Sequence, residues 1–193
     1  MVAVDPHTGS DEVPTVDADN RRGAQLATQH LLDLGHRRIG FVGGRVDLES
    51  ARLRELGYTE TMERAGLPVD PDHVRTGSYD TDQSHAAAAE LLSLPDPPTA
   101  LFAANDLSAI AVMEEAATRG LRVPENLSVV GFDDVPESAM VKPGLTTVHQ
   151  PIQEMGERAV QLLLGLLAGR APGVMHETLA THLVERRSSA RRR

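Results

Sequence analysis

Polar side chains follow several of the apolar runs in this 193-residue sequence. They carry carboxylate, amide or phenol groups, namely Asp5, Tyr79, Asn105, Asp106, Asp133, Asp134 and Gln150. Carboxylates accept hydrogen bonds from hydroxyl groups, amides both accept and donate, and a tyrosine ring can cover the apolar face of a sugar. Ligands bind outside the carboxyl ends of parallel strands, so the set predicts a site for a neutral polyol. The alternative interpretation is that Asp106 and Asp134 only begin helices or turns.

Other motifs favour a binding protein over an enzyme. Gly40–Gly44 (GFVGG) lacks the lysine and hydroxyl of a phosphate-binding loop, which predicts a tight turn. The pair Asp133-Asp134 resembles the Mg²⁺ site of a phosphoryl-handling α/β enzyme, which stays the less favoured alternative because Lys142 is the only lysine. The eight histidines lack metal-ligand spacing, and the sequence has no cysteine and no Gly-x-Ser-x-Gly elbow. We therefore expect no catalytic residues, no metal and no cofactor.

The elements that would position these side chains alternate along the chain. Short β-branched runs predict strands at Val2–Asp5, Val13–Val16, Arg38–Val42, His73–Gly77, Ala100–Ala103, Ser128–Phe132, Thr146–Val148 and Thr178–Glu185. Helical periodicity predicts helices over about 19–34, 50–65, 81–94, 106–119 and 152–168. Candidate N-caps are Asp19, Ser50, Thr81 and Asp106, and candidate stops are Gly35, Gly66 and Gly120. This alternation predicts an α/β fold with a doubly wound parallel sheet.

Composition and charge narrow the class of protein further. The chain is 40% hydrophobic and 24% charged, without a long apolar run or a secretory signal, which predicts a folded cytoplasmic protein with no membrane contact. The last eight residues (RRSSARRR) hold five arginines, and without them the formal net charge of the chain falls from −9 to −14. The rest of the chain is so acidic that it repels DNA phosphates, which makes it a poor surface for binding DNA. We expect the basic tail to be a solvated, frayed end.

An ordered series of motifs resembles the effector-binding region of the LacI/GalR family of bacterial transcriptional regulators. The similar segments are VPTVDADNRRG (13–23), LGHRRIGFVGG (34–44), SARLRELGY (50–58), PTALFAAND (98–106), GLRVPENLSVVGFDD (120–134), LTTVHQ (145–150) and LVERRSSA (183–190). The resemblance covers almost the whole chain. It implies a periplasmic-binding-protein-like fold of type I, in which two α/β lobes close on a ligand.

The resemblance also implies roles for single residues and a division into lobes. The residues that match effector contacts of the family are Asp5, Arg54, Tyr79, Asn105, Asp133 and Gln150. Of these six residues, Arg54 is the one that does not follow an apolar run, so it is expected from the resemblance alone. Residues 1–16 and 149–170 would form part of an N-terminal lobe, and residues 17–148 and 171–187 a complete C-terminal lobe, followed by the tail 188–193. The DNA-binding headpiece and the start of the first lobe would be missing, as in a truncated regulator.

The implied function is that of a sensor. A small polar effector, expected to be a carbohydrate, would bind between the lobes and change operator binding allosterically through the absent headpiece. The resemblance implies a homodimer, with Ile110, Met113 and Met140 at its interface or, alternatively, in the core. The leucine-rich helix 152–168 would lack its usual cover and be mobile or aggregation-prone. The other alternative is a stand-alone sugar-binding module.

Overall fold

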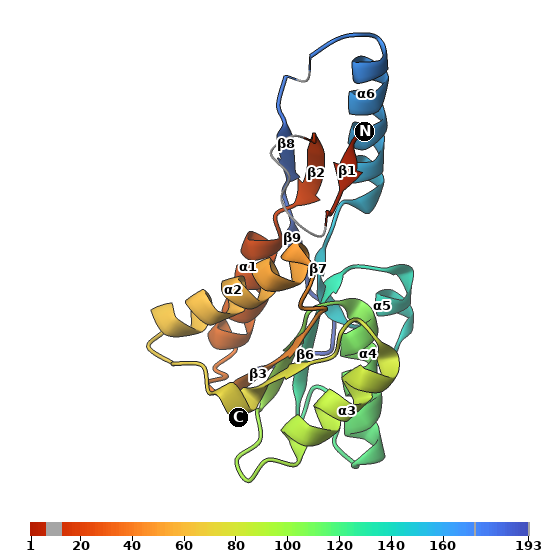
Figure 1. Cartoon of the computed structure of the whole chain (residues 1–193). Coiled ribbons are helices and arrows are strands. Elements are labelled where there is room, and N and C mark those ends of the chain that lie inside the picture. The colour runs from red at the N-terminus through yellow and green to blue at the C-terminus, as the bar shows by residue number, and fades with distance from the viewer. Residues whose placement is uncertain (7–12, 172, 193) are drawn as a thin grey trace.

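The computed structural model describes residues 1–6, 13–171 and 173–192, which form two α/β lobes (Figure 1). The small lobe holds a three-stranded parallel sheet in the order β1-β2-β8, from Ala3–Val4, Thr15–Ala18 and His176–Leu179. Helix α6 (Ile152–Leu167) packs beside this sheet. The large lobe holds the remaining elements. No helix among the described residues is long and apolar enough to cross a membrane.

The large lobe is built on a six-stranded sheet in the order β4-β3-β5-β6-β7-β9. Its strands are β3 (Ile39–Gly43), β4 (Val74–Thr76), β5 (Ala100–Ala103), β6 (Ser128–Asp133), β7 (Thr146–His149) and β9 (His182–Val184). The first five run parallel, and β9 is antiparallel to β7. The predicted doubly wound α/β class is confirmed, with one antiparallel strand at the edge.

Helices cover both faces of the large sheet because its strands are apolar on both sides. Helices α1 (Asn20–Asp33) and α2 (Glu49–Arg64) lie on one face, over a core that includes Phe41, Phe102 and Phe132. Helices α3 (Thr81–Leu92) and α4 (Asp106–Thr118) cover the other face, against Val42 and Leu101. The structure adds two short elements that we did not predict, the 3₁₀ turn η1 (Pro71–His73) and helix α5 (Pro136–Met140).

The helix ends follow the predicted chemistry with small shifts. Gly35, Gly66 and Gly120 each take a positive φ just after a helix, as expected for a glycine stop. Asp19 caps α1 by accepting from a backbone N–H. The other three predicted caps are wrong. Asp80 and Asn105 cap α3 and α4, one residue before the predicted Thr81 and Asp106, and Ser50 lies inside α2.

The segment predicted as a single strand, Thr178–Glu185, is divided between the lobes. Its first part belongs to β8, which pairs with β2 in the small sheet, and its second part forms β9 in the large sheet. The chain therefore passes between the lobes at three places in the described residues, after β2, β7 and β8. The sequence-based boundaries placed residues 17–18 and 171–187 in the large lobe, whereas β2 and β8 lie in the small sheet.

The basic tail is packed, so the expectation of a frayed end is wrong for the described part of it. Ser188 is fully buried, and its hydroxyl donates to the Val129 carbonyl at 2.6 Å and accepts from the Thr146 N–H at 2.8 Å. The Arg192 N–H donates to the Leu34 carbonyl at 2.8 Å. These bonds attach the tail to strands β6 and β7 and to the end of α1. Arg193 lies outside the described residues.

Helix α6 carries a broad apolar surface of which only one edge is covered. Met155 packs with Val16 and Ala18 of β2 in the small-lobe core. The exposed apolar side chains of the helix are Ile152, Val160, Leu163, Leu164 and Leu167. The incomplete cover that the sequence suggests is therefore present, while the mobility and aggregation of this helix stay predictions.

Candidate functional site

The six residues expected to bind an effector line one cavity of about 380 Å³. They come from six different parts of the chain, at the ends of β1, β4, β5, β6 and β7 and from α2. In chain order they are Asp5, Arg54, Tyr79, Asn105, Asp133 and Gln150, and Leu48, Ser50, Leu107 and Ile152 complete the lining. The cavity lies at the carboxyl ends of the large-sheet strands and reaches the small lobe through Asp5 and Ile152. Its volume suits a small ligand.

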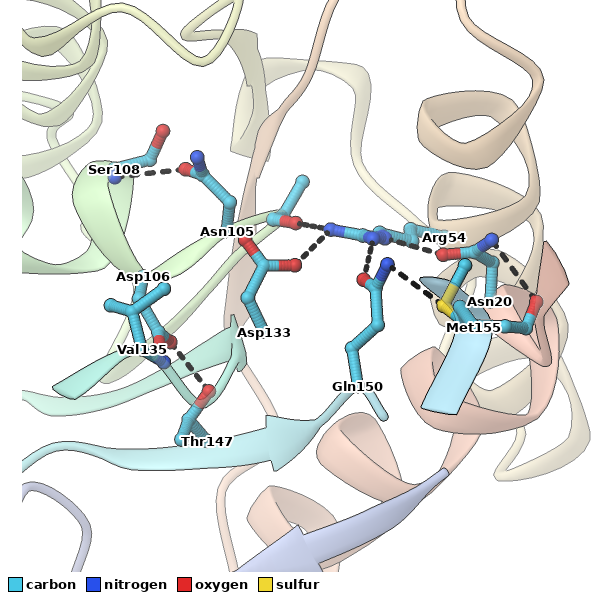
Figure 2. Close-up of polar contacts among 12 residues, drawn as sticks. Asn20, Arg54, Asn105, Asp106, Ser108, Asp133, Val135, Thr147, Gln150 and Met155 are labelled. Atoms are coloured by element: carbon cyan, nitrogen blue, oxygen red, sulfur yellow. Dashed lines mark hydrogen bonds and ion pairs between the residues drawn. The ribbon is translucent and has the colours of Figure 1, made fainter. Parts of the chain in front are cut away.

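The Arg54 guanidinium lies at the centre of the polar contacts (Figure 2). Its Nη1 donates to the Ala104 carbonyl at 2.5 Å and to Asp133 Oδ1 at 3.1 Å. Its Nη2 donates to Gln150 Oε1 at 2.8 Å, and its Nε donates to Asn20 Oδ1 at 2.8 Å. These four bonds use four of the five N–H groups that an arginine carries, which leaves one for a ligand.

Burial makes those contacts necessary. Arg54 is only 3% exposed, and its guanidinium carbon lies 3.7 Å from the centroid of the Phe132 ring. A buried charge without partners is strongly unfavourable, so the network must hold this side chain in one position. Arg54 is therefore a buried charge of the site and not a solvated charge on the surface of α2.

Asp133 presents its carboxylate to both Arg54 and the cavity. Its side chain is 21% exposed, and its backbone takes a φ of 116°, an unusual value for a residue other than glycine. Burial raises the pKa of Asp133, while the neighbouring Arg54 opposes that rise. The bond to Arg54 uses Oδ1, so Oδ2 is an acceptor available for a donor group in the cavity.

The neighbouring acids have structural contacts instead. Asp134 accepts from Arg186 Nη2 at 2.7 Å and lies 3.0 Å from His149 Nδ1, and these contacts hold its pKa below the usual range against the effect of burial. Asp106 is buried beneath the site, where it accepts from the Thr147 hydroxyl and a backbone N–H. The Asp133-Asp134 pair therefore does not form a joint cation site. The described residues contain no group of three potential metal ligands.

Two other lining residues offer polar groups to the cavity. Asn105 uses its Oδ1 to cap α4, which leaves its NH₂ group as a donor. The Tyr79 hydroxyl is buried with no hydrogen-bond partner among the described residues, and burial raises the pKa of this phenol. The ring lies so close to Gly44 that an added Cβ there would come within 2.2 Å of it.

The sequence reasoning named Asp133 and Gln150 but missed the other residues that hold Arg54 in place. Asn20 is 2% exposed and bonds the guanidinium from the start of α1, and Phe132 packs under it. The strand-end pattern could have found Asn20, because it follows β2 by two residues. The contact of Ala104 with Arg54 is made by a backbone carbonyl, which the residue type does not indicate. No sequence pattern marks Met155 either, although its sulfur contacts the Gln150 amide.

The three residues expected at a dimer interface lie in different surroundings. Met140 is 73% exposed, and Ile110 is partly buried against the core under α3 and α4. Met113 is 8% exposed and belongs to that core, which matches the alternative interpretation given for it. An interface through Ile110 and Met140 stays a prediction.

Comparisons with known proteins place this geometry among regulators. Residues 28–189 match the family described as periplasmic binding protein-like domain. The HTH-type transcriptional repressor CytR of Escherichia coli (strain K12) is 36% identical over 178 residues, which are 92% of this chain and 52% of that protein. The chain thus spans about half the length of the curated relatives it matches.

Two solved structures are similar over nearly the whole chain. The transcriptional regulator CelR in complex with cellobiose has a TM-score of 0.91 and 36% identity, covering 97% of this chain and 57% of that one. A LacI family transcriptional regulator from Mycobacterium smegmatis has a TM-score of 0.88 and 34% identity, covering 96% and 69%. These relatives are transcriptional regulators and not enzymes.

Proposed function

The chain belongs to the LacI family of transcriptional regulators, as part of their periplasmic binding protein-like effector domain, and from this membership we propose that its cavity binds a small neutral carbohydrate as effector. The observation that carries the proposal is the convergence of Asp5, Tyr79, Asn105 and Asp133 on one cavity around a buried arginine. Asp133 and Asp5 accept hydrogen bonds, Asn105 and Arg54 donate them, and the Tyr79 ring supplies an apolar face.

The charges in the cavity favour a neutral ligand over an anionic one. Arg54 is the single cation among the lining residues, and its charge is already opposed by Asp133 at 3.1 Å. Asp5 adds a second carboxylate to the lining, so a phosphate or carboxylate ligand would meet net negative charge. Vicinal hydroxyl groups can instead donate to the carboxylates and accept from the amide. The complex of CelR with cellobiose gives one example of a sugar on this fold.

We further propose that the chain works as the sensing part of an allosteric regulator. The effector would favour one arrangement of the two lobes, and a homodimer would pass that change to DNA-binding headpieces on operator DNA. The crystal structure of the lac repressor dimer on its operator, with the anti-inducer ONPF, is an example of such an assembly. This role would place the protein in the cytoplasm, where the DNA is.

The test is calorimetry with a panel of sugars that includes cellobiose and ribose. A sugar that binds the parent chain should bind Asp133→Ala more weakly by about 1.5–3 kcal/mol, the value of a charge-assisted hydrogen bond. That loss is roughly ten- to over a hundredfold in Kd. The matched control is Asp82→Ala in the exposed first turn of α3, which should leave Kd unchanged. An unchanged Kd in Asp133→Ala, or tighter binding of sugar phosphates than of the parent sugars, would refute the proposal.

A further inference from the structure

Two of the three passages between the lobes come together at one side chain. The chain leaves the small lobe after β2, and Asn20 is the first residue of α1 beyond that point. It leaves the large lobe after β7, and Gln150 is the first residue beyond that strand. Arg54 of α2 bonds both, through Nε and Nη2 (Figure 2).

Asn20 is built to hold the arginine at the first passage. It is 2% exposed, and its Nδ2 donates to the Ala18 carbonyl, the last residue of β2, at 3.1 Å. That bond fixes the amide so that its Oδ1 accepts from Arg54 Nε. The contact therefore runs from the end of a small-lobe strand, through Asn20, to the guanidinium.

Gln150 makes the corresponding contact at the second passage. Its Oε1 accepts from Arg54 Nη2 at 2.8 Å, and its Nε2 contacts Met155 Sδ of α6 at 3.7 Å. Met155 belongs to the small-lobe core. The backbone N–H of Gln150 donates to the Asp133 carbonyl at the end of β6. Gln150 thus contacts Met155 of the small-lobe core, the end of β6 in the large lobe and the guanidinium at once.

We propose that Arg54 clamps the two lobes together and that Asn20 is the positioning residue of this clamp. The Nη1 group is anchored in the large lobe by the Ala104 carbonyl and by Asp133. The guanidinium is planar, and its donors point in fixed directions, so Nε and Nη2 can reach Asn20 and Gln150 together only over a narrow range of lobe angles. The small lobe holds Asn20 through the Ala18 carbonyl and contacts Gln150 through Met155 Sδ, so a rotation of the small lobe breaks one of these contacts or pulls Asn20 or Gln150 away from the guanidinium.

The clamp gives the cavity a direct effect on lobe geometry. Arg54, Gln150 and Asp133 line the cavity and also form the clamp. A molecule that bonds the free N–H of Arg54, or that competes for Gln150, changes the balance between the lobe arrangements by the difference in its affinity for them. All bonds of the clamp join residues of the chain itself, so the clamp can be tested apart from effector binding.

The test measures the distance between the lobes in the full chain with no ligand added. The sequence contains no cysteine, so Ala86→Cys in α3 and Glu157→Cys in α6, both at exposed positions, accept two nitroxide labels specifically. Pulsed electron paramagnetic resonance then gives the distribution of distances between the labels. Asn20→Ala and Arg54→Lys should broaden and shift this distribution, because a lysine ammonium cannot bond both passages in the guanidinium geometry.

Conservative variants and a matched control separate the clamp from general loss of structure. Asn20→Asp keeps the acceptor for Arg54 Nε but loses the donor to the Ala18 carbonyl, so it should shift the distribution as Asn20→Ala does, without leaving the guanidinium unpaired. Arg52→Lys, an exposed arginine on the same helix with an ion pair to Glu49, should leave it unchanged. Gln150→Met removes the bond between Gln150 and Arg54 and leaves the Asn20 bond in place. This variant therefore still tests the clamp if Asn20→Ala does not fold. Parent-like distributions in folded Arg54→Lys and Gln150→Met would overturn the proposal, whatever the sugar titrations show.

Discussion

Asp106 should make the stability of the large lobe depend on pH. It is the first residue of α4, fully buried, and burial raises its pKa to about 7 from 3.8. Hydrogen bonds from the Thr147 hydroxyl at 2.5 Å and the Val135 N–H at 2.9 Å oppose this rise only in part. The folded protein therefore holds a proton here that the unfolded chain releases at a lower pH.

The sign and size of the effect follow from proton linkage. Between pH 3.8 and about 7 the folded state binds more protons at Asp106 than the unfolded state, so stability falls as the pH rises. The contribution of this group is greatest at low pH and falls by about 1.4 kcal/mol for each pH unit in that window. From pH 5 to pH 7 the free energy of unfolding should lose roughly 2–3 kcal/mol through this carboxyl group.

Asp106→Asn should remove that loss. The amide oxygen can accept from the Val135 N–H, and the amide NH₂ can donate to the Thr147 hydroxyl, which rotates to accept. The variant should therefore gain about 2–3 kcal/mol over the parent chain as the pH rises from 5 to 7. Two tyrosines and no tryptophan make fluorescence weak, so urea unfolding is followed by far-ultraviolet circular dichroism.

The comparison between variant and parent cancels the titration of the other acids and histidines. Asp82→Asn, at an exposed position of α3, serves as the control and should show no pH-dependent difference from the parent. If the stability difference between Asp106→Asn and the parent is the same at pH 5, 6 and 7, the buried carboxyl is not protonated as the structure implies, and the reasoning fails.

Two further predictions concern packing. Ser188→Ala should destabilise the large lobe by about 1–3 kcal/mol in urea unfolding, because the buried N–H of Thr146 loses its acceptor; no loss would mean that the tail does not pack as described. Gly57→Ala should lower Tm, since the new Cβ would lie 2.4 Å from a carbonyl oxygen of α1. Gly156→Ala in α6, with nothing within 4 Å of the new Cβ, should instead stabilise by up to about 1 kcal/mol, and equal Tm changes in the two variants would contradict the close approach of α1 and α2.

The cavity lining could be predicted from sequence because parallel strands bring their carboxyl ends to one edge. Tyr79, Asn105 and Asp133 each follow or end a strand that the alternating pattern identifies, so their meeting needs only the sheet. Arg54 is different, because it lies inside α2 and nothing in the local pattern marks it. Only the family resemblance predicts that Arg54 lines the effector site.

The features that the sequence did not predict depend on bonds between distant residues. Ser188 is a small polar residue between arginines, and only its bonds to β6 and β7 explain its burial. The division of 176–184 into two strands depends on which neighbours β8 and β9 find, namely β2 and β7. Two of the three wrong helix caps were missed by one residue, because Asp80-Thr81 and Asn105-Asp106 each offer two capping side chains in a row.

The division of the chain between the lobes has a consequence for its synthesis. The large lobe needs β9 and Ser188, and both follow α6 of the small lobe in sequence. While a ribosome is still making α6, strand β7 has no partner on its outer side, and the N–H of Thr146 lacks the Ser188 hydroxyl. An unpaired edge strand is a site for wrong pairing with other chains. The nascent large lobe therefore stays open to such contacts until residues 182–188 have left the ribosome.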